Sequence, residues 1–135
     1  MKKVLSVAMV LCLAALVMVG CNPNSPEKTL KEAAKVADKL MAGKQADEIT
    51  TVRSITYEDN AMVYRYDVQE SDEFTVGDME DLRFLLEPAQ REAFESEPNF
   101  AKEVIPLLKR VDGSIKCIYY GAQTGEEFVM EFKFE

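Results

Sequence analysis

The side chains on which most enzymes rely are unevenly represented in this sequence. Its 135 residues include 24 acidic side chains and no histidine. Without an imidazole, the Ser-His-Asp and Cys-His mechanisms and the common histidine-bearing zinc sites are excluded. No glycine-rich phosphate loop is present either. An enzyme would need paired carboxylates or a serine with a lysine. Because no carboxylate stands in a pattern that singles it out, we predict a protein that is not an enzyme and has no cofactor.

Negative charge is concentrated in the middle of the chain, where residues 58–103 hold 14 acidic and four basic side chains. A dense cluster within this stretch consists of Asp72, Glu73, Asp78, Glu80 and Asp81. It lacks the alternating ligand spacing and the central glycine of an EF-hand, so we predict no metal site there. The cluster is our candidate contact surface for a basic protein partner. The alternative is a solvated surface that keeps the protein soluble.

The sequence contains three cysteines, at positions 12, 21 and 117. Cys12 lies within an apolar N-terminal run, and Cys21 directly follows that run. Cys117 would be the one thiol left after export and lipid attachment, so no internal disulfide could form and packing must stabilise the fold. Its alternating apolar surroundings predict a small, half-buried side chain rather than a reactive thiol.

The N-terminus has the charge and hydrophobicity pattern of an export signal. Lys2 and Lys3 precede the apolar residues 4–19, and Gly20 and Cys21 follow. The apolar run is shorter than the roughly 20 residues that a membrane-spanning helix needs. We therefore predict a signal peptide over residues 1–20.

The segment Met18-Val19-Gly20-Cys21 resembles the lipobox of bacterial lipoprotein precursors, with methionine in place of the preferred leucine. The resemblance covers residues 1–21 and implies cleavage after Gly20 and lipid attachment at Cys21. Several acyl chains would exceed the two signals that stable membrane anchoring requires. By the enterobacterial lipoprotein rule, Asn22 implies the periplasmic side of the outer membrane. The alternative is an ordinary signal peptide, or an uncleaved anchor, that ends in Gly-Cys by chance.

Removal of residues 1–20 leaves 115 residues, which is one small domain. It also takes the net charge from −8 to −10, because two lysines and no acid leave with the signal. This charge argues against nucleic acid as a partner. We expect a lipidated cysteine and short tether over residues 21–26 and a single domain over residues 27–135. The four residues 22–25 of this tether reach about 13 Å when extended at about 3.3 Å per residue, so the domain must begin close to the lipid surface.

A helix is predicted from Pro26 to about Ala42, with Ser25 as its N-cap and Gly43 as its stop. Its apolar residues share one arc, and the opposite side carries a row of lysines: Lys28, Lys31, Lys35 and Lys39. The row could rest on anionic lipid headgroups. A solvated helix face is the interpretation that we favour.

Two hairpins are predicted from residues that alternate with a period of two. The first joins residues 50–57 to residues 62–68 through a turn at 58–60, and the second joins residues 114–120 to 126–134. The expected inward side chains are Met62, Tyr64, Tyr66, Val68, Phe128, Met130, Phe132 and Phe134. The two tyrosines could form a ligand platform, but core packing is the commoner use.

The connection between the hairpins is predicted to be helical. Residues 75–78 match a capping box that opens a helix, which Pro88 interrupts or restarts. A further helix is expected from Asn99 to Val111, with Pro106 kinking it or ending its regular part.

These elements predict an α+β fold of about four antiparallel strands in two hairpins, with three helices packed on one face, in the order α-β-β-α-α-β-β. We expect a membrane-anchored, non-catalytic protein-binding or assembly module. In general organisation it is similar to small envelope lipoproteins such as pilotins and outer-membrane assembly factors. One alternative is an inhibitor or immunity protein that uses its acidic face. Another is a small-ligand carrier with an apolar cavity behind residues 128–134.

Overall fold

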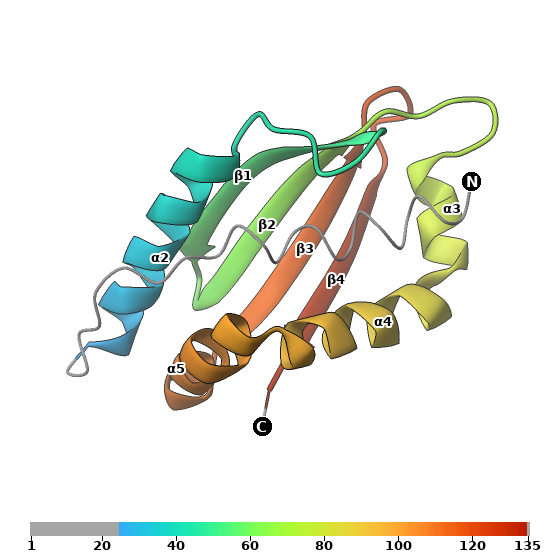
Figure 1. Cartoon of the computed structure of the whole chain (residues 1–135). Coiled ribbons are helices and arrows are strands. Elements are labelled where there is room, and N and C mark those ends of the chain that lie inside the picture. Colours follow the sequence, from blue (N-terminus) through green and yellow to red (C-terminus); the bar gives the residue numbers. More distant parts are fainter. Residues whose placement is uncertain (1–24, 135) are drawn as a thin grey trace.

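Two β-hairpins and the helices between them make up most of residues 25–134, which are the residues that the computed structural model describes (Figure 1). In chain order the elements are α2 (Pro26–Met41), β1 (Thr50–Glu58), β2 (Ala61–Val68), α3 (Val76–Asp81), α4 (Arg83–Ser96), the π-helical segment η2 (Phe100–Val104), α5 (Ile105–Val111), β3 (Ser114–Gly121) and β4 (Glu127–Lys133). The α+β class and both predicted hairpins are confirmed. The predicted signal peptide and Cys21 lie outside the described residues.

The four strands form one sheet in the order β1-β2-β3-β4. The strands within each hairpin are antiparallel, whereas β2 and β3 run parallel, with Tyr64 opposite Cys117. The prediction of an entirely antiparallel sheet is therefore wrong. The helices between β2 and β3 form the long crossover connection that a parallel pair of neighbouring strands requires.

The first hairpin closes through Asp59 and Asn60, which both have a positive φ, of 52° and 64°. Two successive left-handed residues are typical of a type I′ turn, whose twist suits the strands on either side. The Asn60 side-chain amide donates a hydrogen bond of 2.8 Å to the carbonyl of Val111, at the end of α5. The predicted turn is confirmed, and it also attaches the hairpin to the helical region.

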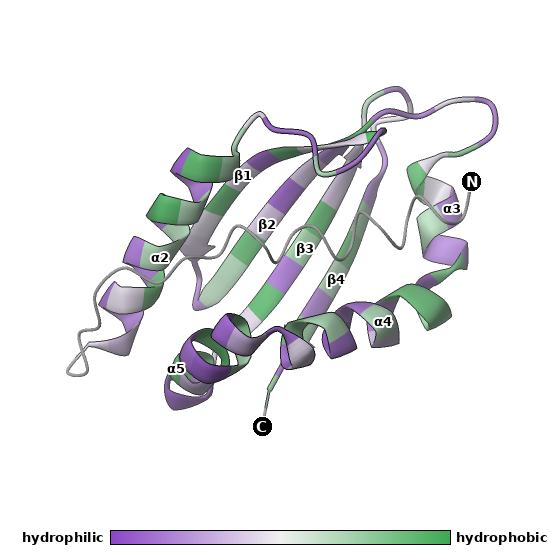
Figure 2. Cartoon of the chain, viewed as in Figure 1, coloured by the Kyte–Doolittle hydropathy of each residue, from purple (hydrophilic) through white to green (hydrophobic). Residues whose placement is uncertain are grey.

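One face of the sheet is buried under the helices. The predicted inward side chains of β2 are at most 2% exposed, and those of β4 are buried as well. Figure 2 shows the resulting bands of hydrophobic and hydrophilic residues along the strands. Tyr66 stacks on Tyr119 with the ring centroids 4.7 Å apart, so the tyrosines contribute to the core. Cys117 is 1% exposed, and so lies deeper than predicted.

All the helices contribute to the same core. Their buried apolar side chains include Leu30, Ala34, Ala37, Val76, Met79, Leu86, Phe94, Phe100, Leu107 and Leu108, which form one cluster with the inward face of the sheet. The prediction of helices on one face is confirmed. The number of helices is not, because residues 25–134 form four α-helices and a π-helical segment instead of three helices.

The prolines act differently from the prediction. The helical region that begins after Thr75 breaks at Leu82, and α4 continues through Pro88. The carbonyl that loses its helical donor to Pro88 belongs to Phe84, on an exposed turn where water can replace the donor. Pro106 lies in the first turn of α5, where a backbone N–H has no partner within the helix, so it begins the regular helix rather than ending it.

Candidate functional site

Four apolar residues are exposed next to one another on the outer side of α4. Phe84 is 71% exposed and Leu85 57% exposed, and Pro88 and Ala89, one turn further on, are also exposed. Residues four apart are neighbours on a helix surface, so these side chains are contiguous. We name them the α4 strip, and Figure 2 shows its beginning as a hydrophobic band where α4 meets α3. An exposed apolar patch of this kind is typical of an interaction surface.

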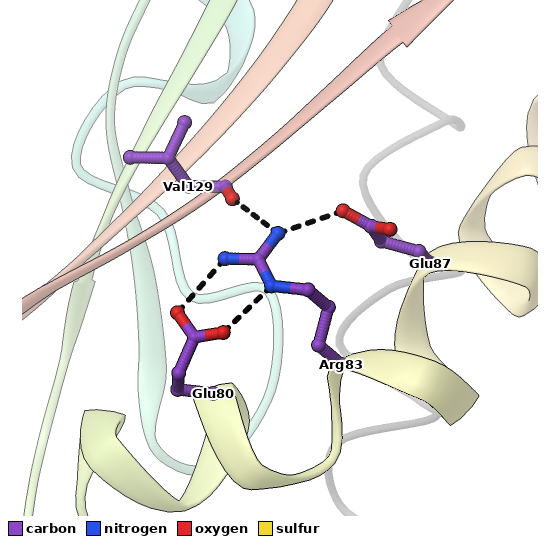
Figure 3. A network of polar contacts seen from close by, with 4 residues as sticks. All are labelled: Glu80, Arg83, Glu87 and Val129. Atoms are coloured by element: carbon purple, nitrogen blue, oxygen red, sulfur yellow. Dashed lines mark hydrogen bonds and ion pairs between the residues drawn. The ribbon is translucent and has the colours of Figure 1, made fainter.

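Arg83 holds the beginning of α4 against the sheet (Figure 3). Its guanidinium donates two hydrogen bonds to the carboxylate of Glu80, of 2.7 and 2.8 Å. It donates two more, to Glu87 at 2.7 Å and to the carbonyl of Val129 at 2.8 Å. The same guanidinium lies over the ring of Phe128, 4.7 Å from its centroid.

The charges in this network stabilise one another. The hydrogen bonds from Arg83 lower the pKa of Glu80. In turn, the carboxylates of Glu80 and Glu87 raise the pKa of Arg83, with Glu80 as the larger cause. Bidentate contact of this kind fixes the orientation of the guanidinium plane. The first turn of α4 is therefore positioned before any partner arrives.

Arg91 makes the corresponding contact two turns later. Its guanidinium donates a 3.0 Å hydrogen bond to the carbonyl of Lys133 and lies over the rings of Phe132 and Phe134. Between the two arginines, a shallow groove of about 370 Å³ separates α4 from β4, and Phe84 and Pro88 line one side of it. The α4 strip thus borders a recess that a partner side chain can enter.

Two of the five predicted contact residues have structural roles. Asp78 accepts a 2.8 Å hydrogen bond from the backbone N–H of Thr75, which is the predicted capping interaction at the start of α3. Glu80 is held by Arg83. Since both carboxylates already have partners in the fold, they are poor candidates for contact with another protein.

The other three, Asp72, Glu73 and Asp81, are exposed, and their carboxylates have no hydrogen bond or ion pair within residues 25–134. Asp81 is the last residue of α3, two positions before α4 begins, and the exposed Glu92 lies one turn beyond the α4 strip. The strip therefore has an acidic residue at each end. The predicted acidic cluster and the apolar strip meet at Asp81.

Sequence reasoning missed the most deeply buried carboxylate of the described residues. Glu70 is 2% exposed, and it accepts hydrogen bonds from the backbone N–H groups of Val76, Gln123 and Thr124 at 2.8, 3.0 and 2.8 Å, and from the Thr124 hydroxyl at 2.9 Å. Burial alone would raise the pKa of Glu70, but these four bonds together hold it below its ordinary value. A lone glutamate after a strand gives no signal of this role.

A methyl group cannot be accommodated where Gly121 approaches Glu70. A Cβ at position 121 would lie 2.5 Å from both carboxylate oxygens. Gly121 and Glu70 are therefore parts of one arrangement, which joins the loop after β2 to the turn between β3 and β4. This arrangement is a structural connection, since each of the two carboxylate oxygens of Glu70 already accepts two hydrogen bonds from the protein itself.

No group of three metal-ligating side chains comes together within residues 25–134. The carboxylates whose pKa is shifted, Glu58, Glu70 and Glu80, all have a lowered pKa because fixed donors contact them. Within the same range there is no helix with the length and hydrophobicity that crossing a bilayer requires.

The fold and the α4 strip together describe an α+β domain with a mixed four-stranded sheet and an exposed apolar helix surface. The chain is similar in structure to a protein of Pseudomonas aeruginosa known as a "putative secreted protein". The TM-score is 0.59 with 12% sequence identity, over 84% of this chain and 95% of that chain. At this identity the likeness shows the fold alone. Neither a protein-family profile nor a curated protein sequence matches the chain.

Proposed function

We propose that this chain is a lipid-anchored protein of the cell envelope whose domain is a non-catalytic protein-binding module. Lipid on Cys21 holds it to the membrane, and the α4 strip is the surface that contacts its partner. The exposure of Phe84 and Leu85 on a rigidly held helix is the observation that carries this proposal.

Exposed aromatic and aliphatic side chains have an unfavourable interaction with water, which contact with a partner relieves. Because Arg83 and Arg91 fix α4 against β4, little conformational freedom remains to be lost on binding. Preorganisation of this kind favours affinity. The strip therefore combines the apolar centre and the rigid support of a protein-docking surface.

The partner's chemistry follows from the residues around the strip. Asp81 and Glu92 lie at its two ends, and the surrounding stretch of chain is acidic. A complementary surface has an apolar centre with lysine or arginine at its rim. An inhibitor acting on a basic target would use the same surface. The alternative of a small-ligand carrier involves a different site, an apolar cavity, and stays a separate prediction.

Location rests on the N-terminal sequence. The lipobox-like segment at residues 18–21 and the preceding apolar run support export and lipid attachment. The structurally similar Pseudomonas protein carries the word "secreted" in its name, which agrees with a place outside the cytoplasm. Asn22 favours the periplasmic side of the outer membrane.

Site-specific photocrosslinking in cells tests the docking surface. A photoreactive amino acid at position 89, within the strip, should give a discrete adduct with one protein. The double change Phe84→Ser and Leu85→Ser should reduce that adduct at least about tenfold, because apolar anchors at the centre of an interface carry most of the binding energy. Both side chains are exposed, so folding should be unaffected.

Leu40→Ser is the matched control, since Leu40 is also an exposed apolar residue, at 44%, but lies on α2. It should leave the adduct unchanged. A photoreactive amino acid at the exposed position of Gln123 gives the background level of crosslinking. An adduct of equal intensity in the double variant would exclude the α4 strip as the docking surface. An adduct at position 89 no stronger than this background would exclude it as well.

A further inference from the structure

The four lysines predicted to share one side of the first helix form a straight exposed row on α2. Lys28, Lys31, Lys35 and Lys39 are all exposed, and at 100° per residue they fall within an arc of about 80°. None of them has an ion pair or side-chain hydrogen bond within the described residues 25–134. The row therefore presents four ammonium groups that the rest of the domain does not neutralise.

A groove of about 550 Å³ runs beside this row, between α2 and β1. Lys31, Lys35 and Lys39 line it on one side, and Val36, Ile55 and Tyr57 supply apolar surface. It thus has cationic groups along its rim and an apolar wall. This composition suits an anionic headgroup together with the glycerol and first methylenes of a lipid.

The acidic side chains of the groove do not cancel its lysines. Asp38 accepts a 2.8 Å hydrogen bond from the backbone N–H of Ile55, and Glu58 forms an ion pair with Arg65 at 2.7 Å. Glu32 is the one carboxylate of the lining without such a partner in residues 25–134. With the Glu58–Arg65 pair set aside, three lysines face the two carboxylates of Glu32 and Asp38, so the groove keeps a small net positive charge.

The position of this groove in the chain identifies its occupant. α2 begins at Pro26, and the four residues between Cys21 and the helix reach about 13 Å when extended. A lipid on Cys21 would therefore hold the N-terminal end of α2 near the headgroups, and α2 lying along the surface would bring all four lysines within the Debye length of about 8 Å, where attraction is effective. We propose that the lysine row and its groove bind the anionic phospholipid headgroups of the membrane that holds Cys21; this rests on the proposed lipid anchor.

Binding of α2 to the membrane would orient the whole domain. α2 packs beside β1 at one edge of the sheet, and α4 lies along β4 at the other edge (Figure 1). With α2 on the headgroups, the α4 strip points away from them and is accessible to a partner. The lysine row of α2 and the α4 strip therefore lie at opposite edges of the sheet.

Lysine acetylation of the mature, lipidated protein in vesicles tests this orientation. One set of vesicles contains phosphatidylcholine alone, and the other contains phosphatidylglycerol as well. Each lysine close to an anionic surface contributes about 1 kcal/mol to binding, which is a factor of about five in the binding constant. We expect the four α2 lysines to react about fivefold more slowly in the anionic vesicles, and high salt should remove the difference. Lys102 and Lys109, exposed elsewhere in the domain, should react equally in both.

The variant Lys31→Gln, Lys35→Gln, Lys39→Gln should lose the protection of Lys28, whereas the matched variant Lys102→Gln, Lys109→Gln should keep it. The mass of the Cys21 peptide from the same sample reports the anchor separately. A lipidated Cys21 with equal acetylation in both vesicles would overturn the orientation and leave the α4 docking proposal standing. An unmodified Cys21 would overturn the anchor and this inference with it.

Discussion

Glu70 connects parts of the chain that are 53 and 54 residues apart, through its bonds to Gln123 and Thr124. Replacing its carboxylate by an amide in Glu70→Gln removes the charge that four donors surround and places an NH2 group against buried N–H groups. We expect the free energy of unfolding to fall by about 2–4 kcal/mol. Urea denaturation measures this, with Glu73→Gln, at an exposed position, as the control that should change stability by less than about 0.5 kcal/mol. Equal midpoints for both variants would contradict the role of Glu70.

The lowered pKa of Glu70 also predicts how stability depends on pH. In the folded state this pKa lies below the ordinary value of 4.5, which describes the unfolded chain. The unfolded state therefore binds the proton first as the pH falls, so the stabilisation is present above the ordinary pKa and is lost as the pH falls through the folded pKa. Wild-type protein should lose more stability than Glu70→Gln below about pH 5. Parallel curves of unfolding free energy against pH would contradict this.

Gln90 presents the opposite case, a buried polar group without partners. It is 1% exposed, and neither its amide nitrogen nor its amide oxygen has a hydrogen bond partner among residues 25–134. It lies on the core side of α4 between Leu86 and Phe94. An unsatisfied buried amide costs about 1–3 kcal/mol.

Gln90→Leu should therefore raise the free energy of unfolding by about 1–2 kcal/mol, because the leucine side chain is of similar size and needs no hydrogen bond. Denaturation midpoints check this, and Gln123→Leu at an exposed position serves as the control. A loss of stability in Gln90→Leu would show that the amide has a partner, such as bound water or a small ligand in the core.

At the scale of elements, both outer strands of the sheet have neighbours that cover their free edges. On β1, the backbone N–H of Ile55 donates to Asp38 of α2, and Val52 exchanges backbone hydrogen bonds with Gly43 and Lys44. Unpaired strand edges are templates for association with another chain. The segment that follows α2 therefore closes the β1 edge as well as connecting the elements.

The β4 edge is closed by side chains from α4. Arg83 and Arg91 donate to the carbonyls of Val129 and Lys133, which lie on the same side of the strand. Eight residues of helix and four residues of strand both span roughly 12–13 Å, so the two contacts stay in register. One helix thereby protects the edge strand along most of its length.

Replacing both arginines, as Arg83→Met with Arg91→Met, should uncover this edge while keeping the apolar contact over Phe128 and Phe132. We expect self-association that increases with protein concentration, measured by light scattering. The variant Lys102→Met with Lys109→Met removes the same charge elsewhere and should stay unassociated. Identical scattering from the two variants would contradict the protective role of the arginines.

At the scale of the whole molecule, the sheet separates two surfaces of different character. The basic row of α2 lies at the β1 edge, and the apolar α4 strip, with Asp81 and Glu92 at its ends, lies at the β4 edge. The strand order β1-β2-β3-β4 sets the distance between them, since neighbouring strands are about 4.8 Å apart. A domain held at one edge and binding at the other fits the proposed anchored module.

Much of the secondary structure could be predicted from residues close together in the chain. The alternation along β4, the turn at 58–60, and the end of α2 before Gly43 are local patterns, and the structure confirms them. In β2 the predicted inward residues are buried, but so is Val63, which was predicted to face outward. The lipobox-like segment is also local, and its chemistry stays a prediction. The acidic cluster was only partly informative, because composition does not show which carboxylates find partners within the fold.

The sequence by itself determined which side chains of β4 face the core and where the hairpins turn, because these depend on neighbours a few positions away. Only the tertiary structure decided that β2 and β3 run parallel, that Glu70 is buried, and that Phe84 and Leu85 stay exposed. Each of these depends on which distant segments pack together. The periodicity of a segment specifies a buried face, but not the direction or identity of the element that covers it.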